Sequence, residues 1–132
     1  VCSPIYDVAL NLPALVRSLK LQKRAARVGF DWPEISQVLD KIDEETKELV
    51  EAKENEPQER INEEFGDLMF SIVNLGRHLK VDPEEALKQT NKKFIDRFKF
   101  VEEAILSEGK DIQSASLEKM EKLWNKAKKN QY

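Results

Sequence analysis

Residues 35–50, ISQVLDKIDEETKELV, and residues 61–79, INEEFGDLMFSIVNLGRHL, decide the fold of this chain. Apolar residues recur in both stretches every three or four positions, which is the period of an α-helix that buries one face. Pro57 marks a turn between the two stretches. Because the connection is short, the sequence predicts two long helices that pack as antiparallel neighbours.

The flanking sequence predicts further helices and no strands. A first helix starts near Pro13 and stops at Gly29, a residue typical of helix C-termini. Asp82 is a capping residue followed by proline, which predicts the start of a fourth helix, and a last short helix covers about residues 117–127. We therefore expect an all-α fold, an antiparallel four-helix-bundle-like domain of about five helices, with helical sequence over about residues 12–129.

Length and charge narrow the class of protein. A chain of 132 residues fits a single domain, residues 1–132. Its net charge of −3 gives no basic surface for duplex nucleic acid, and no apolar run reaches the roughly 20 residues that cross a bilayer. The lone Cys2 excludes an internal disulfide, which suits a reducing compartment. We expect a soluble cytoplasmic protein, with no nucleic-acid or membrane partner, and Val1 in place of Met suggests a segment of a longer or processed polypeptide.

Each of the two central stretches carries a pair of carboxylates three residues apart, and such residues share a face of a helix. On a helical wheel both pairs lie roughly 80° and 140° from the centre of the apolar stripe, on the same rotational side. Glu44 and Glu63 point away from the stripe. An antiparallel helix pair would gather the selected acids into one oxygen-rich site; they are Glu45, Glu48, Glu64 and Asp67.

Spacing alone leaves two interpretations of these acids open. They are either solvated charges on soluble helices, as expected in a chain with 36% charged residues, or ligands of a divalent cation. Acids on a shared flank repel one another unless a cation or basic groups neutralise them, and hard cations prefer oxygen ligands.

The predicted fourth helix supplies basic partners for these acids. Lys93 and Arg97 lie four residues apart, on the same rotational side of the apolar stripe as the carboxylates on their helices. Asn91 falls near the middle of that stripe, where its amide should form a hydrogen bond, either to another helix or to a ligand. The residues expected to point inward are Leu87, Asn91, Phe94, Ile95, Phe98, Val101 and Ile105.

Aromatic residues at the junction before the second helix have two possible roles. Phe30 and Trp32 either plug the end of the core or line a pocket. Clustered acids, a nearby Lys and Arg, an amide and aromatic side chains fit one kind of ligand, a polyphosphate that carries a ring. Mg²⁺ held by carboxylates would bind the phosphate oxygens and activate water.

Several segments together resemble a known family. KIDEETKEL, EEFGDLMFSIVNLGRHL and DPEEALKQTNKKFIDRF occur in this order, and the chain resembles the MazG nucleoside triphosphate pyrophosphohydrolases of the all-α NTP pyrophosphatase superfamily. The opening LPALVRSLKLQKRAARVGFDWPE and the ending LEKMEKLWNKAK look like the C-terminal catalytic domain of a two-domain MazG protein. The resemblance covers about residues 12–129.

The resemblance implies hydrolysis of NTPs or dNTPs to a monophosphate and pyrophosphate by a homodimer. It implies that Mg²⁺, with Mn²⁺ as a substitute, is held by Glu45, Glu48, Glu64 and Asp67. Lys93 and Arg97 would then face the phosphates, while Asn91, Trp124 and Trp32 would help hold the nucleoside.

Other helical and hydrolytic classes fit less well. A carboxylate-bridged di-iron bundle needs Glu-x-x-His pairs, yet the only histidine, His78, follows Leu75 by three positions. A P-loop needs a Gly-rich segment ending in GK[ST], which the sequence lacks. The remaining alternative is a non-catalytic helical dimerisation or regulatory module of a larger protein.

Overall fold

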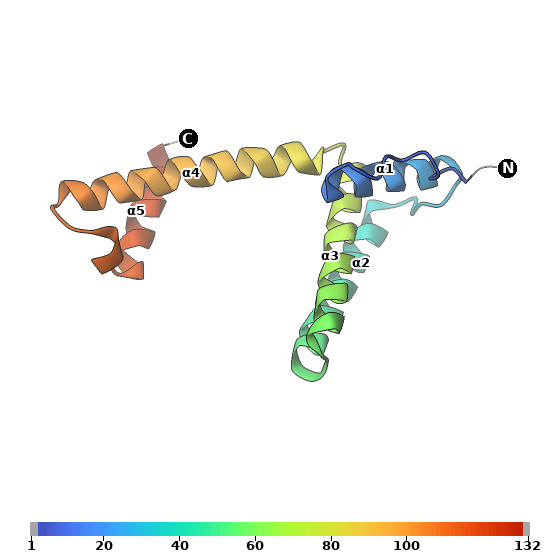
Figure 1. Ribbon diagram of the computed structural model, residues 1–132, viewed down its shortest axis with the longest axis horizontal. Coiled ribbons are helices and arrows are strands. Elements are labelled where there is room, and N and C mark those ends of the chain that lie inside the picture. Colours follow the sequence, from blue (N-terminus) through green and yellow to red (C-terminus); the bar gives the residue numbers. More distant parts are fainter. Residues whose placement is uncertain (1–2, 131–132) are drawn as a thin grey trace. The chain divides into compact units, whose positions relative to one another are not determined.

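The computed structural model describes residues 3–130, so Cys2 lies outside the described residues. Within this part the chain forms five α-helices and one short 3₁₀ helix, and no strand (Figure 1). The prediction of an all-α fold with about five helices is therefore confirmed. The helices are α1 (Ala14–Arg27), α2 (Ile35–Asn55), α3 (Gln58–His78), α4 (Pro83–Ser107) and α5 (Leu117–Asn130), with the 3₁₀ helix η1 at Ile112–Ser114.

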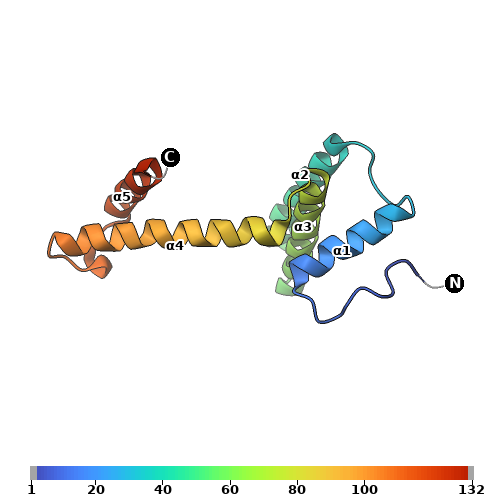
Figure 2. The ribbon, with the colours of Figure 1, turned by 90° about the horizontal axis from the view of Figure 1, so that it is seen from above.

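The helices belong to two compact units, Val1–Glu84 and Glu85–Tyr132. In the first unit α2 and α3 run side by side and antiparallel, and α1 packs on α3 (Figures 1 and 2). The expected helix pair is thus present. That the whole chain is one domain and that it forms a four-helix bundle stay predictions.

Local sequence explains where the helices of the first unit begin and end. Gly29 takes a φ of 91°, which glycine adopts without strain, and its N–H donates to Ala26 O over 3.0 Å just past the end of α1. A capping box formed by Glu34 and Gln37 starts α2. Val38, buried at the start of α2, belongs to the core of this unit.

Helix α4 begins with a capped first turn, and most of its length lies in the second unit. Glu84 N–H donates to Asp82 Oδ1 over 3.0 Å at the start of α4, as the capping pattern predicted. The aromatic rings of Phe94 on α4 and Trp124 on α5 lie 5.4 Å apart between centroids. The unit buries three apolar residues below a tenth exposed: Val101, Ile105 and Ala127.

The predicted inward stripe of α4 is only partly buried. Val101 and Ile105 are buried as expected, but four other apolar members of the stripe are exposed: Leu87, Phe94, Ile95 and Phe98. Asn91 is exposed too, so the expectation that it lies on a buried face is wrong for the single chain. The helical period identifies the apolar face, but burial also needs an element that covers it.

No helix in residues 3–130 combines the length and the apolar character that would let it cross a membrane.

Candidate metal centre

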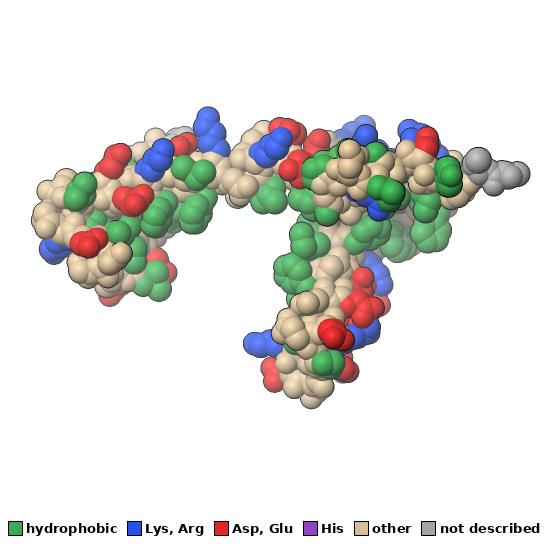
Figure 3. All heavy atoms as spheres, in the orientation of Figure 1, with side chains coloured by type: hydrophobic (Ala, Val, Ile, Leu, Met, Phe, Trp, Pro, Cys, Tyr) green, Lys and Arg blue, Asp and Glu red, His purple; other side chains and the backbone are tan. Residues whose placement is uncertain are grey.

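Three carboxylates meet on the α2–α3 pair. One oxygen each of Glu45, Glu48 and Glu64 lies within 4.8 Å of the others. Glu45 is 5% exposed and Glu64 is 3% exposed, whereas Glu48 is more open to solvent. Acidic side chains gather on this helix pair, with basic side chains beside them (Figure 3).

Asp67 is not a member of this group of three carboxylates. It lies on α3 one turn after Glu64, and its side chain is exposed. The structure thus brings together three of the four acids that the helical wheel selected. Glu44 and Glu63 point outward as predicted, since their side chains are 58% and 62% exposed.

A basic side chain holds one oxygen of each buried carboxylate. Lys41 Nζ lies 2.9 Å from Glu45 Oε1, and Arg60 Nη2 lies 2.7 Å from Glu64 Oε1. The sequence reasoning missed both basic residues. The signal was present, because each precedes its acid by four positions on the same helix, the spacing that places two side chains on one face.

The second oxygen of each buried carboxylate has no hydrogen-bond partner among the described residues. Glu45 Oε2 and Glu64 Oε2 are buried and accept no hydrogen bond from the described residues. A buried, unpartnered carboxylate oxygen is costly, because it has lost water without gaining a donor. Two such atoms from facing helices indicate a site that is completed by a bound positive group.

Repulsion among the three carboxylates raises the pKa of Glu48, the most exposed of them. The negative charge of Glu45 raises the pKa of Glu48 above its usual value, and burial and the charge of Glu64 raise it further. Attraction has the corresponding effect on the neighbouring lysine. The hydrogen bond to Glu45 raises the pKa of Lys41, so this lysine stays charged. One lysine and one arginine do not remove the excess negative charge.

These residues fit a hard divalent cation. Mg²⁺ and similar ions take carboxylate oxygens as ligands and keep several waters of their own. The three carboxylates approach one another closely enough to share such an ion, and two of them have a spare buried oxygen. The donor set contains only oxygen atoms, which favours Mg²⁺ or Mn²⁺ over softer metals.

The predicted phosphate and nucleoside residues of α4 and α5 lie in the second unit. Arg97 is buried, and its guanidinium carbon lies 5.6 Å from the ring centroid of Trp124, a cation–π distance. Lys93 is half-buried and Asn91 is exposed. That these residues meet the carboxylates stays a prediction.

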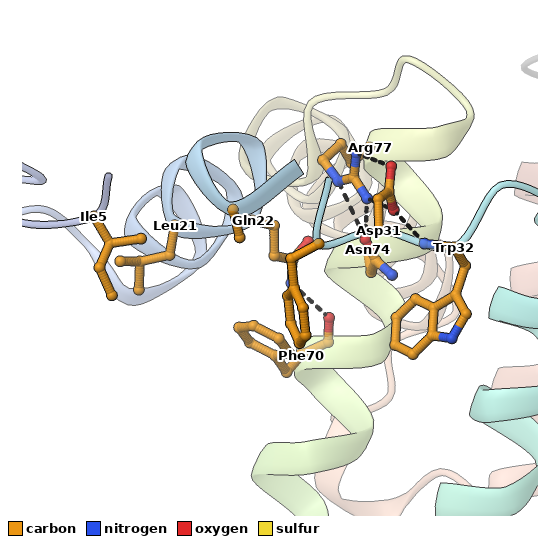
Figure 4. A pocket seen from close by; sticks show the side chains of 10 residues that line it. Ile5, Leu21, Gln22, Asp31, Trp32, Phe70, Asn74 and Arg77 are labelled. Atoms are coloured by element: carbon orange, nitrogen blue, oxygen red, sulfur yellow. Dashed lines mark hydrogen bonds and ion pairs between the residues drawn. The ribbon is translucent and has the colours of Figure 1, made fainter. Parts of the chain in front are cut away.

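Trp32 lines a pocket of about 300 Å³ in the first unit. Residues of α1, of α3, of the connection between α1 and α2 and of the segment before α1 line this open pocket (Figure 4). Of the two roles left open for the junction aromatics, the structure supports the pocket-lining one. Asp31 beside Trp32 forms an ion pair with Arg77, and His78 Nε2 lies 3.2 Å from the same carboxylate.

The fold and the site define a class: all-α proteins that collect carboxylates on an antiparallel helix pair. Residues 34–101 match the MazG nucleotide pyrophosphohydrolase domain, which is more than half of the chain. The chain therefore belongs to the MazG nucleotide pyrophosphohydrolase domain family.

Curated relatives agree with this membership. The chain is 50% identical over 126 residues to the nucleoside triphosphate pyrophosphohydrolase/pyrophosphatase MazG of Thermotoga maritima, covering 96% of this chain and 48% of the relative. It is 42% identical over 131 residues to the nucleoside triphosphate pyrophosphohydrolase of Escherichia coli K12, covering 98% and 50%. The uncharacterized protein YabN of Bacillus subtilis is 46% identical over 130 residues, covering 98% and 27%. The chain thus spans about half the length of these Thermotoga and Escherichia pyrophosphohydrolases.

Proposed function

We propose that this chain hydrolyses nucleoside triphosphates, NTPs or dNTPs, to a nucleoside monophosphate and pyrophosphate with the help of Mg²⁺. The observation that carries the proposal is the pair of buried, unpartnered oxygens on Glu45 and Glu64 within a group of three carboxylates. The names of the Thermotoga and Escherichia relatives describe the same activity in those proteins and support it here.

The reaction breaks one phosphoanhydride bond. A water oxygen attacks the α-phosphorus, the bond from that phosphorus to the bridging oxygen breaks, and pyrophosphate leaves. The water gives its proton to a carboxylate of the site. A metal ion bound there would polarise phosphate oxygens and lower the pKa of a bound water.

The chain's own residues would bind the cation, the phosphates and the nucleoside. Glu45, Glu48 and Glu64 hold the cation, and Asp67 joins them from the next turn of α3. Lys93 and Arg97 neutralise the charge that grows on the leaving pyrophosphate, as basic groups do in phosphoryl transfer. Trp124, Asn91 and Trp32 hold the nucleoside.

A second copy of the chain would complete the protein. Three apolar side chains share one face of α3 and are exposed in the single chain: Phe65, Met69 and Ile72. Such a stripe favours contact with another protein surface. We assign it to a homodimer, which the family resemblance implies. Nucleic acid and membranes are not among the partners that we propose, and the cytoplasm is the proposed location.

An assay of pyrophosphate release tests the proposal. Purified protein with MgCl₂ and a panel of NTPs and dNTPs should release pyrophosphate and not orthophosphate. Glu45→Gln and Glu64→Gln should each lower the rate at least about a hundredfold, because each removes a charged ligand of the cation. Glu54→Gln, an exposed position on α2, is the matched control and should keep the rate.

Two outcomes would count against this proposal. Full activity in Glu45→Gln would show that the carboxylate group is not the reaction centre. No release from any nucleotide, together with no Mg²⁺ or Mn²⁺ binding, would favour the alternative of a non-catalytic helical dimerisation or regulatory module.

A further inference from the structure

Trp32 lies on a connection that apolar packing alone does not fix. Residues 28–34 join α1 to α2 and form neither a helix nor a strand. The aromatic side chains of this connection remain open to solvent, since Phe30 is 82% exposed and Trp32 is 42% exposed. A segment with so little buried apolar surface keeps its conformational freedom unless polar contacts hold it.

One carboxylate anchors this connection to the end of α3. Arg77 Nη1 donates to Asp31 Oδ2 over 3.1 Å, and Arg77 Nη2 donates to Asp31 Oδ1 (Figure 4). The contact is bidentate, so it fixes the direction of the carboxylate as well as its distance. Among the described residues of the connection, 28–34, Asp31 alone has a side chain that forms a hydrogen bond with α3.

An amide on α3 fixes Arg77 in turn. Asn74 is 4% exposed and lies one turn before Arg77 on the same helix. Its Oδ1 accepts from Arg77 Nε over 3.1 Å and from Arg77 Nη2 over 2.8 Å. The guanidinium is therefore held by an amide of its own helix and by the carboxylate of the connection, and this network orients Asp31.

The same carboxylate binds the backbone of Trp32. The Trp32 N–H donates to Asp31 Oδ1 over 2.8 Å. Asn74, Arg77, Asp31 and Trp32 thus form one continuous chain of hydrogen bonds (Figure 4). It begins at a buried side chain of α3 and ends at the tryptophan, so a displacement of Asp31 would move the backbone that carries the indole ring.

We infer that Asp31 and Arg77 are positioning residues, which hold Trp32 in the orientation that binds the nucleoside part of the substrate. The inference rests on the proposed function, in which Trp32 helps hold the nucleoside. A side chain that is fixed before the ligand arrives loses less entropy on binding, so the chain of hydrogen bonds raises the affinity. The nucleoside keeps its place while the phosphoanhydride bond breaks, so this contribution is equal in the bound substrate and in the transition state.

Steady-state kinetics of Asp31→Asn test the inference. The variant should raise KM about fivefold for the NTP that the native protein hydrolyses with the lowest KM, roughly the effect of one lost hydrogen bond. Its kcat should change by less than about twofold, because uniform binding is lost. Asp40→Asn, an exposed position on α2, makes the same chemical change and should leave both constants unchanged. Circular dichroism checks that each variant remains folded at the assay temperature.

A second substitution, at Trp32, separates positioning from simple stabilisation. Calorimetry in MgCl₂ measures the affinity for the α,β-methylene analogues of the NTP panel, whose α–β bridge is not cleaved. Asp31→Asn should weaken binding about fivefold when Trp32 is present and should have no effect in the Trp32→Leu protein, because the effect of Asp31 passes through that side chain. Arg77→Lys keeps the positive charge but loses the bidentate contact, so it should behave like Asp31→Asn in both backgrounds.

The outcomes separate this inference from the proposed function. Pyrophosphate release with the native KM in Asp31→Asn would overturn the positioning role and leave the activity standing. An equal loss of affinity with and without Trp32 would also overturn it, because the ion pair would then act on the fold as a whole. Analogue binding that Asp31→Asn weakens only when Trp32 is present, in a protein that releases no pyrophosphate, would support the positioning role and overturn the activity.

Discussion

Arg60 binds the buried carboxylate of Glu64 through one oxygen only: Nη2 lies 2.7 Å from Oε1, while Oε2 is buried without a partner among residues 3–130. On α2, Lys41 likewise binds Oε1 of Glu45, while Glu45 Oε2 is buried without a partner among the described residues. The two basic residues thus fix the orientation of both carboxylates and leave one oxygen of each for a ligand. A cation site that is oriented in advance loses less entropy when the ion binds.

Arg60→Met should destabilise the metal-free protein more than the metal-bound one. Without Arg60 the buried Glu64 keeps a charge that nothing on its own helix compensates, so the melting temperature in EDTA should fall by about 5 °C. Saturating Mg²⁺ should reduce that loss, because the ion binds only the folded site. Thermal unfolding followed by circular dichroism measures both values.

Arg60→Lys retains the positive charge and is the control for this prediction. It should lose less stability in EDTA than Arg60→Met. An identical loss with and without Mg²⁺ would mean that Arg60 does not act on a metal site.

Glu48→Gln should stabilise the metal-free protein while weakening metal binding. The pKa of Glu48 is raised, mainly by the charge of Glu45, so the folded protein binds the Glu48 proton more tightly than the unfolded chain does. Stability therefore falls as the pH rises from the ordinary glutamate value through the raised one, and the deficit persists above both. The uncharged amide of the glutamine in Glu48→Gln removes this repulsion.

Urea unfolding in EDTA measures the effect of Glu48→Gln. The variant should be more stable than the native protein at pH 8, and the gain should disappear at pH 3, well below the ordinary glutamate value of 4.5, where Glu48 is protonated in both states. Calorimetric titration with Mn²⁺ should show weaker binding. A variant that is less stable at pH 8 would contradict the repulsion.

The sequence predicted the helices well because their signals are local. Gly29 and Asp82 mark helix ends through backbone geometry and capping, which depend on a few neighbouring residues. The helical wheel likewise selected Glu45, Glu48 and Glu64, because both helices bury the same face against each other. A period locates a face reliably when a partner helix follows directly in the sequence.

The remaining features of the fold and the site depend on contacts that the hydrophobic periodicity of the sequence does not reveal. Asn91 lies on the apolar stripe of α4, yet it is exposed because burial needs a covering element. The unpartnered oxygen of Gln22 follows from its contact with Phe70, 48 positions away. The helical wheel also selected Asp67, but the group of carboxylates with oxygens within 4.8 Å of one another contains Glu45, Glu48 and Glu64.

Asp31→Asn should destabilise the protein near neutral pH and much less in acid. The hydrogen bond from Arg77 holds the pKa of Asp31 below its usual value, and the charges of Arg77 and His78 lower it further. The unfolded chain then takes up this proton more readily, so the stabilisation is present above pH 3.8 and is lost as the pH falls below it. We expect a loss of about 1 kcal/mol at pH 7, as for a partly exposed bidentate pair.

Urea unfolding at pH 7 and pH 3 measures the contribution of Asp31. The difference between the native protein and Asp31→Asn should shrink at pH 3, and Asp40→Asn, an exposed position on α2, should show little difference at either pH. A gap that stays constant down to pH 3 would mean that the Asp31 charge does not supply this stability.

Met69→Glu should weaken the proposed dimer. Met69 lies between Phe65 and Ile72 in the exposed apolar stripe of α3, and a carboxylate buried there would have no partner. A loss of about 2 kcal/mol, typical of a central interface residue, weakens the dimer about thirtyfold. Sedimentation equilibrium at several protein concentrations measures the change. Leu106→Glu, an exposed apolar position at the end of α4, is the control and should leave the dimer intact; a native protein that sediments as a monomer would remove the role given to the stripe.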